Sequence, residues 1–273
     1  MTIANLNDVL LPAMNSGRAV LGLVVLGWED ARAFIEAADE TGIPIILQAG
    51  PGCRAYTPVP VLGKMFRHLA EQARVPVVCH IDHATTVDEC RAGIEHGFSS
   101  VMIDGSRLEI SRNINLTAEV VCIAKPHNVS VEGEVGFVGY SGGQHGVLTN
   151  PKEAQRFDLE SGADALAVSV GNVHLSTQKT DGINLEALRA IEAVTKLPLV
   201  LHGGSGILLA TRQMLARQTR VSKFNIGTEL RMEFGKALRK SLADQPDTFD
   251  RIALLNPTIA AMRTATVDLL RTA

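Results

Sequence analysis

The chain has 273 residues, of which 46% are hydrophobic and 4% are aromatic. Such a chain is too apolar to be disordered, and it is long enough for one large α/β domain, which we expect to span residues 1–273. The formal net charge is −3 and the basic residues form no run, so we expect no nucleic-acid partner.

The amino end lacks the basic start and the apolar core of a signal peptide. No later window holds the roughly 18 uninterrupted apolar residues of a membrane helix. We therefore expect a cytoplasmic protein with no membrane partner. The four cysteines, Cys53, Cys79, Cys90 and Cys122, lie far apart, which is typical of reduced thiols without a zinc-finger or redox role.

Short apolar runs alternate with longer amphipathic stretches along the whole chain. The apolar runs predict eight strands, at residues 19–25, 43–47, 77–81, 100–103, 129–132, 165–169, 199–201 and 221–226. Helical periodicity covers residues 28–41, 61–74, 87–96, 116–126, 151–161, 185–195, 210–218, 228–242 and 249–271. Eight strands that alternate with helices favour an α/β fold closed into a single (β/α)8 TIM barrel, with an extra C-terminal helix, over an open sheet.

Polar residues gather where the predicted strands end, which is where barrels of this type carry their chemistry. In chain order these residues are His80, Asp82 and His83, then Asp104, then Glu132 and Glu134, then Asn172 and His174, then His202, and last Asn225 and Thr228. Histidines delivered from three separate strand ends are typical of a divalent metal site with open positions for substrate. The other histidines, His68, His96 and His127, are expected at the surface.

A glycine-rich turn at residues 201–207 follows the seventh strand. Its glycines let backbone N–H groups approach an anion, and Ser205 adds a hydroxyl just before a helix, so the turn predicts a phosphate site. An ordinary strand-to-helix turn is the alternative. Asn225 and Thr228, after the eighth strand, supply further donors beside it.

Six motifs together resemble those of the class II, metal-dependent ketose-bisphosphate aldolases, which act on fructose or tagatose bisphosphate. They are HIDH at 80–83, VMIDGS at 101–106, VEGEVG at 131–136, GNVH at 171–174, LHGGSG at 201–206 and KFNIGT at 223–228, in the family's order. The resemblance implies a zinc-dependent carbon–carbon lyase that makes or cleaves a phosphorylated ketose through the enediolate of dihydroxyacetone phosphate. It also implies a homodimer or homotetramer.

Carried over by position, the resemblance implies a role for each of several residues. The zinc ligands would be His83, His174 and His202, with Asp104 and Glu134 as weaker candidates; Asp82 would exchange a proton with the aldehyde-derived hydroxyl; Gly203, Ser205, Asn225 and Thr228 would hold the phosphate. Adjacent strand residues point to opposite faces, so Asp82 and His83 can both face the site only if the backbone breaks its regularity there.

Three departures from the family pattern stand out. The loop at residues 136–145 carries no acid where the family has a proton-transferring carboxylate, so either Tyr140 or His145 takes over, or this step is altered or lost. Leu175 stands where the family has a glycine that helps to hold phosphate and a monovalent cation. The first two barrel loops lack the family's Asn and Ser, and Arg54 there is either an anion contact or a surface residue.

Two other functions remain open: a phosphosugar-binding protein without turnover, and a metal-dependent sugar-phosphate epimerase or isomerase. The apolar residues of the C-terminal stretch could pack against a second subunit or on the chain's own barrel. They are Ile252, Ala253, Leu254, Leu255, Ile259 and Met262.

Overall fold

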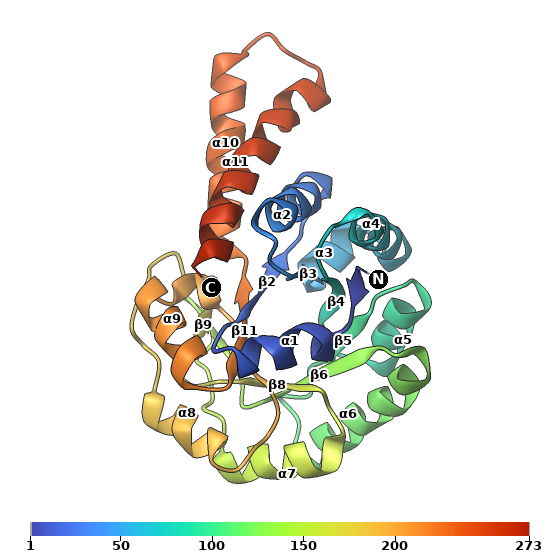
Figure 1. Cartoon of the computed structure of the whole chain (residues 1–273), viewed down its shortest axis with the longest axis vertical. Coiled ribbons are helices and arrows are strands. Elements are labelled where there is room, and N and C mark those ends of the chain that lie inside the picture. Colours follow the sequence, from blue (N-terminus) through green and yellow to red (C-terminus); the bar gives the residue numbers. More distant parts are fainter. Residues whose placement is uncertain (1, 273) are drawn as a thin grey trace.

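The computed structural model describes residues 2–272, which form a closed barrel of eight parallel strands. The strands are β2 (Val20–Val24), β3 (Ile45–Ala49), β4 (Val77–Ala84), β5 (Ser100–Ile103), β6 (Ser130–Val135), β8 (Ala165–Val168), β10 (Leu199–Leu201) and β11 (Val221–Ile226). Each strand pairs in parallel with the next, and β11 pairs with β2 to close the ring (Figure 1). The predicted (β/α)8 barrel is therefore confirmed.

Helices cover the outside of the barrel and bury their apolar faces against the strands. They are α2 (Trp28–Thr41), α4 (Val59–Gln72), α5 (Val87–Glu95), α6 (Ile110–Ala124), α7 (Pro151–Ser161), α8 (Leu185–Glu192), α9 (Leu209–Gln218) and α10 (Thr228–Asp244), with short 3-10 turns at Lys125–His127 and Gly204–Gly206. The helix predicted at 116–126 begins already at Ile110, because the Glu109 side chain accepts a hydrogen bond from the Ser111 N–H and caps the first turn.

One helix that periodicity did not reveal, α1 (Leu6–Asn15), lies across the amino-terminal mouth of the barrel (Figure 1). It follows β1 (Ile3–Ala4), which pairs with β4. Leu6, Val9 and Leu10 are buried against the inward-facing residues of the lower barrel. Those residues are Val20, Ile46, Val78, Met102, Ala165, Ala167 and Val200.

Three short elements, also not predicted, shape the opposite, carboxyl-terminal mouth. Helix α3 (Pro51–Tyr56) follows β3, and β7 (Gly139–Tyr140) pairs with β9 (Val173–His174) in a small separate sheet. Two-residue strands form only because the tertiary fold brings them together, so no local sequence pattern predicts them. Their pairing brings the loop after β6 beside His174.

Helix α11 (Arg251–Arg271) follows α10, and the two form a hairpin that projects from the barrel (Figure 1). Helix α11 packs on α2, where Ile259 and Met262 are buried, whereas Ile252 is 77% exposed. The C-terminal apolar residues thus divide between the chain's own core and its surface.

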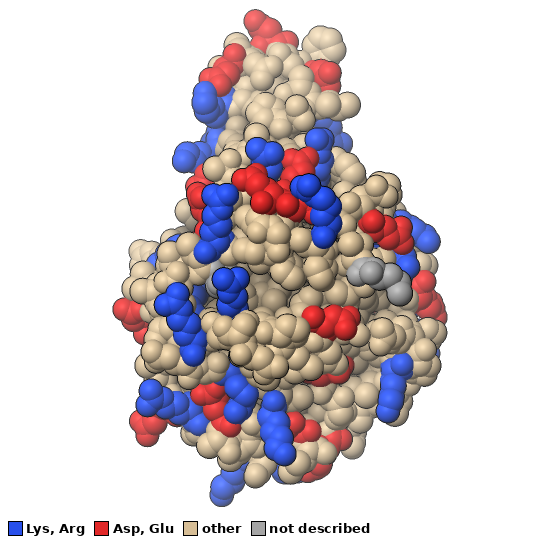
Figure 2. Space-filling view, viewed as in Figure 1, with Lys and Arg blue, Asp and Glu red and all other residues tan. Residues whose placement is uncertain are grey.

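Among the described helices, none has the length and apolar character needed to span a bilayer. On the face shown in Figure 2, basic and acidic side chains are interspersed.

Candidate active site

Inward-facing residues become polar in the upper half of the barrel, toward the carboxyl ends of the strands. They are His80 and Asp82 of β4, Glu132 and Glu134 of β6, and Lys223 and Asn225 of β11, all of them buried. Because side chains alternate along a strand, each of these pairs occupies two successive layers of the barrel interior. His202 follows β10 and is fully buried beside them.

The backbone of β4 breaks its regularity at His83. The pairing with β5 runs from Ile81 opposite Val101 to Ala84 opposite Ile103, so two residues of β4 face the single residue Met102. Within this bulge His83 has a φ of 51°, in the left-handed region. The break turns both Asp82 and His83 toward the barrel mouth, as the sequence required, and that prediction is confirmed.

The structure brings the three predicted histidine ligands together. Ring nitrogens of His83, His174 and His202 lie within 4.8 Å of one another. The Nε2 atom of His83 and the Nδ1 atom of His202 are buried and have no hydrogen-bond partner among residues 2–272. Buried polar nitrogens without a partner are costly unless a ligand satisfies them, so the arrangement fits a metal ion.

Carboxylates orient two of these rings through their other nitrogen. The Nδ1–H of His83 donates to Asp104 Oδ2 at 2.8 Å, and the Nε2–H of His202 donates to Glu132 Oε1 at 3.1 Å. Each contact fixes the proton on one nitrogen and leaves the other free to ligate, as the outer partners of metal-bound histidines do. Asp104, predicted as a weak ligand, is thus engaged with the ring of His83.

Glu134 is the remaining candidate ligand. Its Oε2 atom lies 3.5 Å from His202 Nδ1 and 3.8 Å from His83 Nδ1, and has no hydrogen-bond partner among the described residues. With His83 and Asp104 it forms a second group of potential ligand atoms that fits a metal. The two groups share His83, so they describe neighbouring positions for an ion.

The electrostatics of the cluster favour a cation. Burial would lower the pKa of His83, but the surrounding carboxylates, with Asp82 first, raise it to about 10. Burial, with the neighbouring His202 and His83, lowers the pKa of His174 to about 3, so this imidazole stays neutral. Burial and the charge of Asp104 raise the pKa of Glu134 to about 8.

A fully buried ion pair lies below the cluster. Lys223 Nζ donates to Glu132 Oε2 at 2.6 Å, and the other oxygen of Glu132 holds His202. His80 lies 3.8 Å from the same carboxylate, and its Nδ1 atom is 2.8 Å from the Ser100 hydroxyl. Lys223 was not predicted as a functional residue, although a lysine at an inward position of an apolar strand is a signal that could have identified it.

A cavity of about 280 Å³ opens above the histidines. It is lined by Asp82, His83, His174, Leu175, Gly203, Ser205, Asn225 and Thr228, which are all predicted site residues, and by Val24, Leu26, Pro51, Cys53, Tyr140 and Arg231 among others. The residues predicted to bind phosphate therefore line the same cavity as His83 and His174. Arg231 was not predicted, and within residues 2–272 its guanidinium forms no ion pair.

The predicted phosphate turn is closely packed around the start of α10. A Cβ on Gly203 would lie 2.1 Å from the Val173 carbonyl oxygen, so only glycine fits there. The Ser205 hydroxyl accepts hydrogen bonds from the N–H groups of Gly227 and Glu229, at 3.2 and 3.3 Å. The hydroxyl thereby joins the turn to the amino end of α10, where the helix dipole favours an anion.

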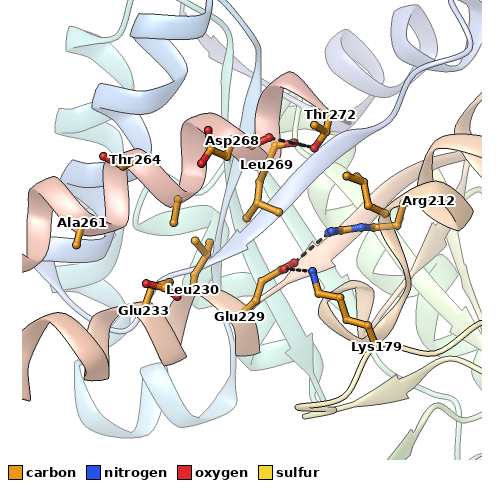
Figure 3. Close-up of a pocket in the computed structure, with 12 residues that line it drawn as sticks. Lys179, Arg212, Glu229, Leu230, Glu233, Ala261, Thr264, Asp268, Leu269 and Thr272 are labelled. Carbon is orange, nitrogen blue, oxygen red and sulfur yellow. Dashed lines mark hydrogen bonds and ion pairs between the residues drawn. The ribbon is translucent and has the colours of Figure 1, made fainter.

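The Glu229 side chain ties this helix start to two other segments. Its carboxylate accepts from Arg212 of α9 at 3.0 Å and from Lys179 at 2.8 Å, as Figure 3 shows beside the C-terminal residues of α11. Arg212 is buried, so the pair is shielded from solvent. The bridge links the predicted phosphate turn to the loop that follows His174.

Two of the departures from the family pattern, the loop at residues 136–145 and Leu175, reach the cavity. Tyr140 lines the cavity and stacks on His174, with ring centroids 5.0 Å apart, whereas His145 is exposed and is not part of the cavity lining. Leu175 has a φ of 57°, a left-handed conformation that glycine adopts freely and leucine does not. The leucine thus keeps the backbone shape expected of a glycine.

Both predictions for Arg54, as an anion contact or as a surface residue, are wrong. Its side chain is only 7% exposed, and its guanidinium donates to backbone carbonyls of β3 and β4 instead of facing the cavity. The cause is helix α3, which no local pattern in the sequence reveals and which carries Arg54 over the strand ends.

Residues 4–273 match the family model described as fructose-bisphosphate aldolase class-II. The chain belongs to the class II fructose-bisphosphate aldolase family. It is 36% identical to the 6-phospho-5-dehydro-2-deoxy-D-gluconate aldolase of Shouchella clausii, over 95% of this chain and 90% of that protein. It is 32% identical to the fructose-bisphosphate aldolase of Geobacillus stearothermophilus, over 99% and 96% of the two chains.

Among solved structures, the YdjI aldolase from Escherichia coli K12 superposes with a TM-score of 0.85 at 28% identity, covering 99% of this chain and 96% of that one. Class II aldolases are metal-dependent, and the histidine cluster provides a site where a metal fits. The chain is therefore a metal-dependent aldolase, as the resemblance implied.

Proposed function

We propose that this class II aldolase uses zinc and makes or cleaves a phosphorylated ketose through the enediolate of dihydroxyacetone phosphate. The observation that carries the proposal is the convergence of the His83 and His174 imidazoles and the predicted phosphate turn on one cavity, with the Nε2 atom of His83 left without a partner. Bound zinc would act as a Lewis acid that polarises the ketone and stabilises the developing negative charge. His83, His174 and His202 would hold it, because neutral imidazole is a favoured zinc ligand.

The phosphate would lie at the amino end of α10. Gly203, Ser205, Asn225 and Thr228 line that part of the cavity together with Leu175, and their backbone and side chains include N–H and O–H groups that could donate to a phosphate. This end supplies donors and a helix dipole for an anion. Arg231 adds the one cationic lining group that lacks an ion-pair partner among the described residues, which suits an anionic group on the substrate.

Asp82 would exchange a proton with the hydroxyl formed from the aldehyde. Its carboxylate lines the cavity next to His83, and the Asn225 side-chain amide lies 3.4 Å from one of its oxygens. An acceptor group at this position can take a proton from a hydroxyl as a carbon–carbon bond breaks.

Tyr140 is the better candidate for the proton transfer that the family assigns to a loop carboxylate. Burial, with the charges of Asp104 and Glu134, raises the pKa of its phenol, so the phenol keeps its proton at neutral pH and can donate it. Tyr140→Phe should lower turnover by roughly 10²–10⁴-fold, the usual contribution of a general acid. His145→Ala, in the same loop but outside the cavity, should leave turnover unchanged, and equal losses in both variants would contradict the assignment.

The overall reaction is tested by incubating the zinc-loaded protein with fructose bisphosphate or 6-phospho-5-dehydro-2-deoxy-D-gluconate, the compounds named for the relatives. We expect two fragments from at least one of the two compounds, and none after a chelator is added. A single isomeric product would favour the epimerase alternative. Substrate binding without any product would favour the phosphosugar-binding alternative.

We also propose that the protein is a homo-oligomer, a dimer or a tetramer. The α10–α11 hairpin exposes Phe249 (97%) and Ile252 (77%), which a second subunit would cover. Light scattering on Ile252→Asp should show a smaller particle than the unchanged protein. Identical masses that correspond to one chain would contradict the proposal.

A further inference from the structure

The carboxyl ends of β3 and β4 are held together by one buried guanidinium. Arg54 Nη1 donates to the carbonyl of Ala49 at 2.6 Å and to that of Asp82 at 2.5 Å, and Nη2 donates to the carbonyl of His83 at 3.0 Å. Ala49 is the last residue of β3, and the other two carbonyls belong to the bulge in β4.

The bulge needs such a contact because it interrupts the strand ladder. Residues that bulge out of a ladder lose their regular partners, and His83 in addition has a left-handed backbone that a non-glycine residue adopts at a cost. The His83 N–H is left with the Met102 sulfur, at 3.4 Å, which is a weak acceptor. Carbonyls held by a charged donor replace part of what the ladder would have supplied.

Glu89 of α5 supports the guanidinium from the other side. Its Oε1 atom lies 3.7 Å from Arg54 Nη2, and its Oε2 atom accepts from the Thr85 N–H at 2.7 Å, just past the end of β4. The carboxylate and the guanidinium together enclose the turn that runs from Asp82 to Thr85. None of these contacts faces the cavity, so they act on the shape of the backbone.

We infer that Arg54 is a positioning residue that holds the β4 bulge in the conformation in which His83 can ligate the metal and Asp82 can reach the substrate. This inference rests on the proposed metal site but not on the identity of the sugar. It assigns to Arg54 a task on the opposite side of the backbone from the ligands themselves. Partners of this kind, one shell outside a metal ligand, typically contribute about 10–100-fold to metal affinity.

The test compares Arg54 with an arginine that makes the same kind of contact elsewhere. Arg220 Nη2 donates to the backbone carbonyls of Thr195, at 2.5 Å, and of Glu192, next to the amino end of β11 and away from the cavity. Arg54→Met and Arg220→Met therefore both remove a guanidinium that clamps carbonyls. Only Arg54→Met removes one that touches the bulge.

The zinc dissociation constant of each variant is measured by competition with a chromophoric chelator, well below the melting temperature of the metal-free protein. We expect Arg54→Met to raise the constant about 10–100-fold, and Arg220→Met to leave it within twofold of the unchanged protein. Arg54→Lys, which keeps the charge but cannot reach three carbonyls at once, should fall between them. If Arg54→Met does not fold, Arg54→Lys carries the comparison.

Equal zinc constants for the Arg54 and Arg220 variants would overturn the inference and leave the metal site intact. A protein with unchanged sequence that binds no zinc would instead overturn the proposed metal site, and this inference with it. The two failures are thus distinguishable in a single titration series.

Discussion

The upper and lower halves of the barrel interior are built from the same strands but perform opposite tasks. The lower half contains aliphatic side chains sealed by α1, such as Val78 and Leu10. The upper half begins on β4 at His80, two residues beyond Val78, and contains the buried charges of Glu132 on β6 and Lys223 on β11. On β4, the regular alternation of strand residues therefore places one inward-facing side chain, Val78, in the aliphatic layer and the next, His80, in the charged layer.

Buried ion pairs often contribute little net stability, because desolvation offsets their attraction. We infer that the charged layer serves to orient the proposed ligand His202 through Glu132, while the aliphatic layer and the outer helices supply stability. Mutations in the two halves should therefore have different effects. Upper-half changes should alter metal binding and catalysis, and lower-half changes should alter only the free energy of unfolding.

The largest effect is expected when a ligand is removed. His202→Ala should lower zinc affinity on the order of 10²-fold or more, if the roughly 10–16 kcal/mol of a four-ligand zinc site divides evenly. It should also abolish turnover, because the polarising charge is lost. Metal content after dialysis and product formation are the measurements, with His68→Ala, on the exposed face of α4, as the control. Retention of both zinc and activity would contradict the ligand assignment.

The next effect is expected at the ion pair below the metal. Lys223→Met removes the partner of a fully buried carboxylate and should destabilise the fold by about 3–5 kcal/mol, as broken buried pairs do. Because Glu132 also holds His202, zinc affinity should fall as well. Urea unfolding and a zinc titration measure the two effects, and a loss of stability without any change in zinc affinity would refute the link.

A lower-half change should affect stability alone. Leu10→Ala removes a fully buried side chain of α1 and should cost about 2–5 kcal/mol of unfolding free energy. The zinc dissociation constant should stay within twofold, since the side chain packs at the opposite mouth of the barrel. A large change in zinc affinity in this variant would show that the halves are coupled.

The smallest effect, counted per pH unit, is a pH dependence confined to the upper half. In the metal-free protein the pKa of His83 is about 10, so at pH 7 a metal must displace its proton. Zinc affinity should therefore rise up to about tenfold per pH unit between pH 6 and 9. The stability of the metal-free fold changes with pH in the opposite direction to zinc affinity. The raised pKa of His83 stabilises the folded state below pH 6.5, and this stabilisation is lost as the pH passes about 10. Chelator-buffered titrations at several pH values measure the slope, and a flat profile would contradict it.

The sequence predicts the barrel and the order of its strands, because alternating apolar strands and helices follow from local periodicity. Strands β3, β4 and β6 continue two or three residues beyond their predicted ends at 47, 81 and 132. The sequence also requires a break between Asp82 and His83, which the bulge provides. It does not reveal Arg54 or α1, whose roles depend on where a short helix lies over distant strands. Nor can it choose between Tyr140 and His145, because the choice depends on a two-residue pairing between β7 and β9.

The most direct test of the central claim is solvent deuterium exchange into dihydroxyacetone phosphate, followed by NMR with and without a chelator. It examines the metal, the phosphate turn and the proton transfer together, and it does not require the aldehyde to be known. We predict exchange by the zinc-loaded protein that stops when the metal is removed. Absence of exchange in a protein shown to hold zinc would contradict the claim that this cavity generates the enediolate.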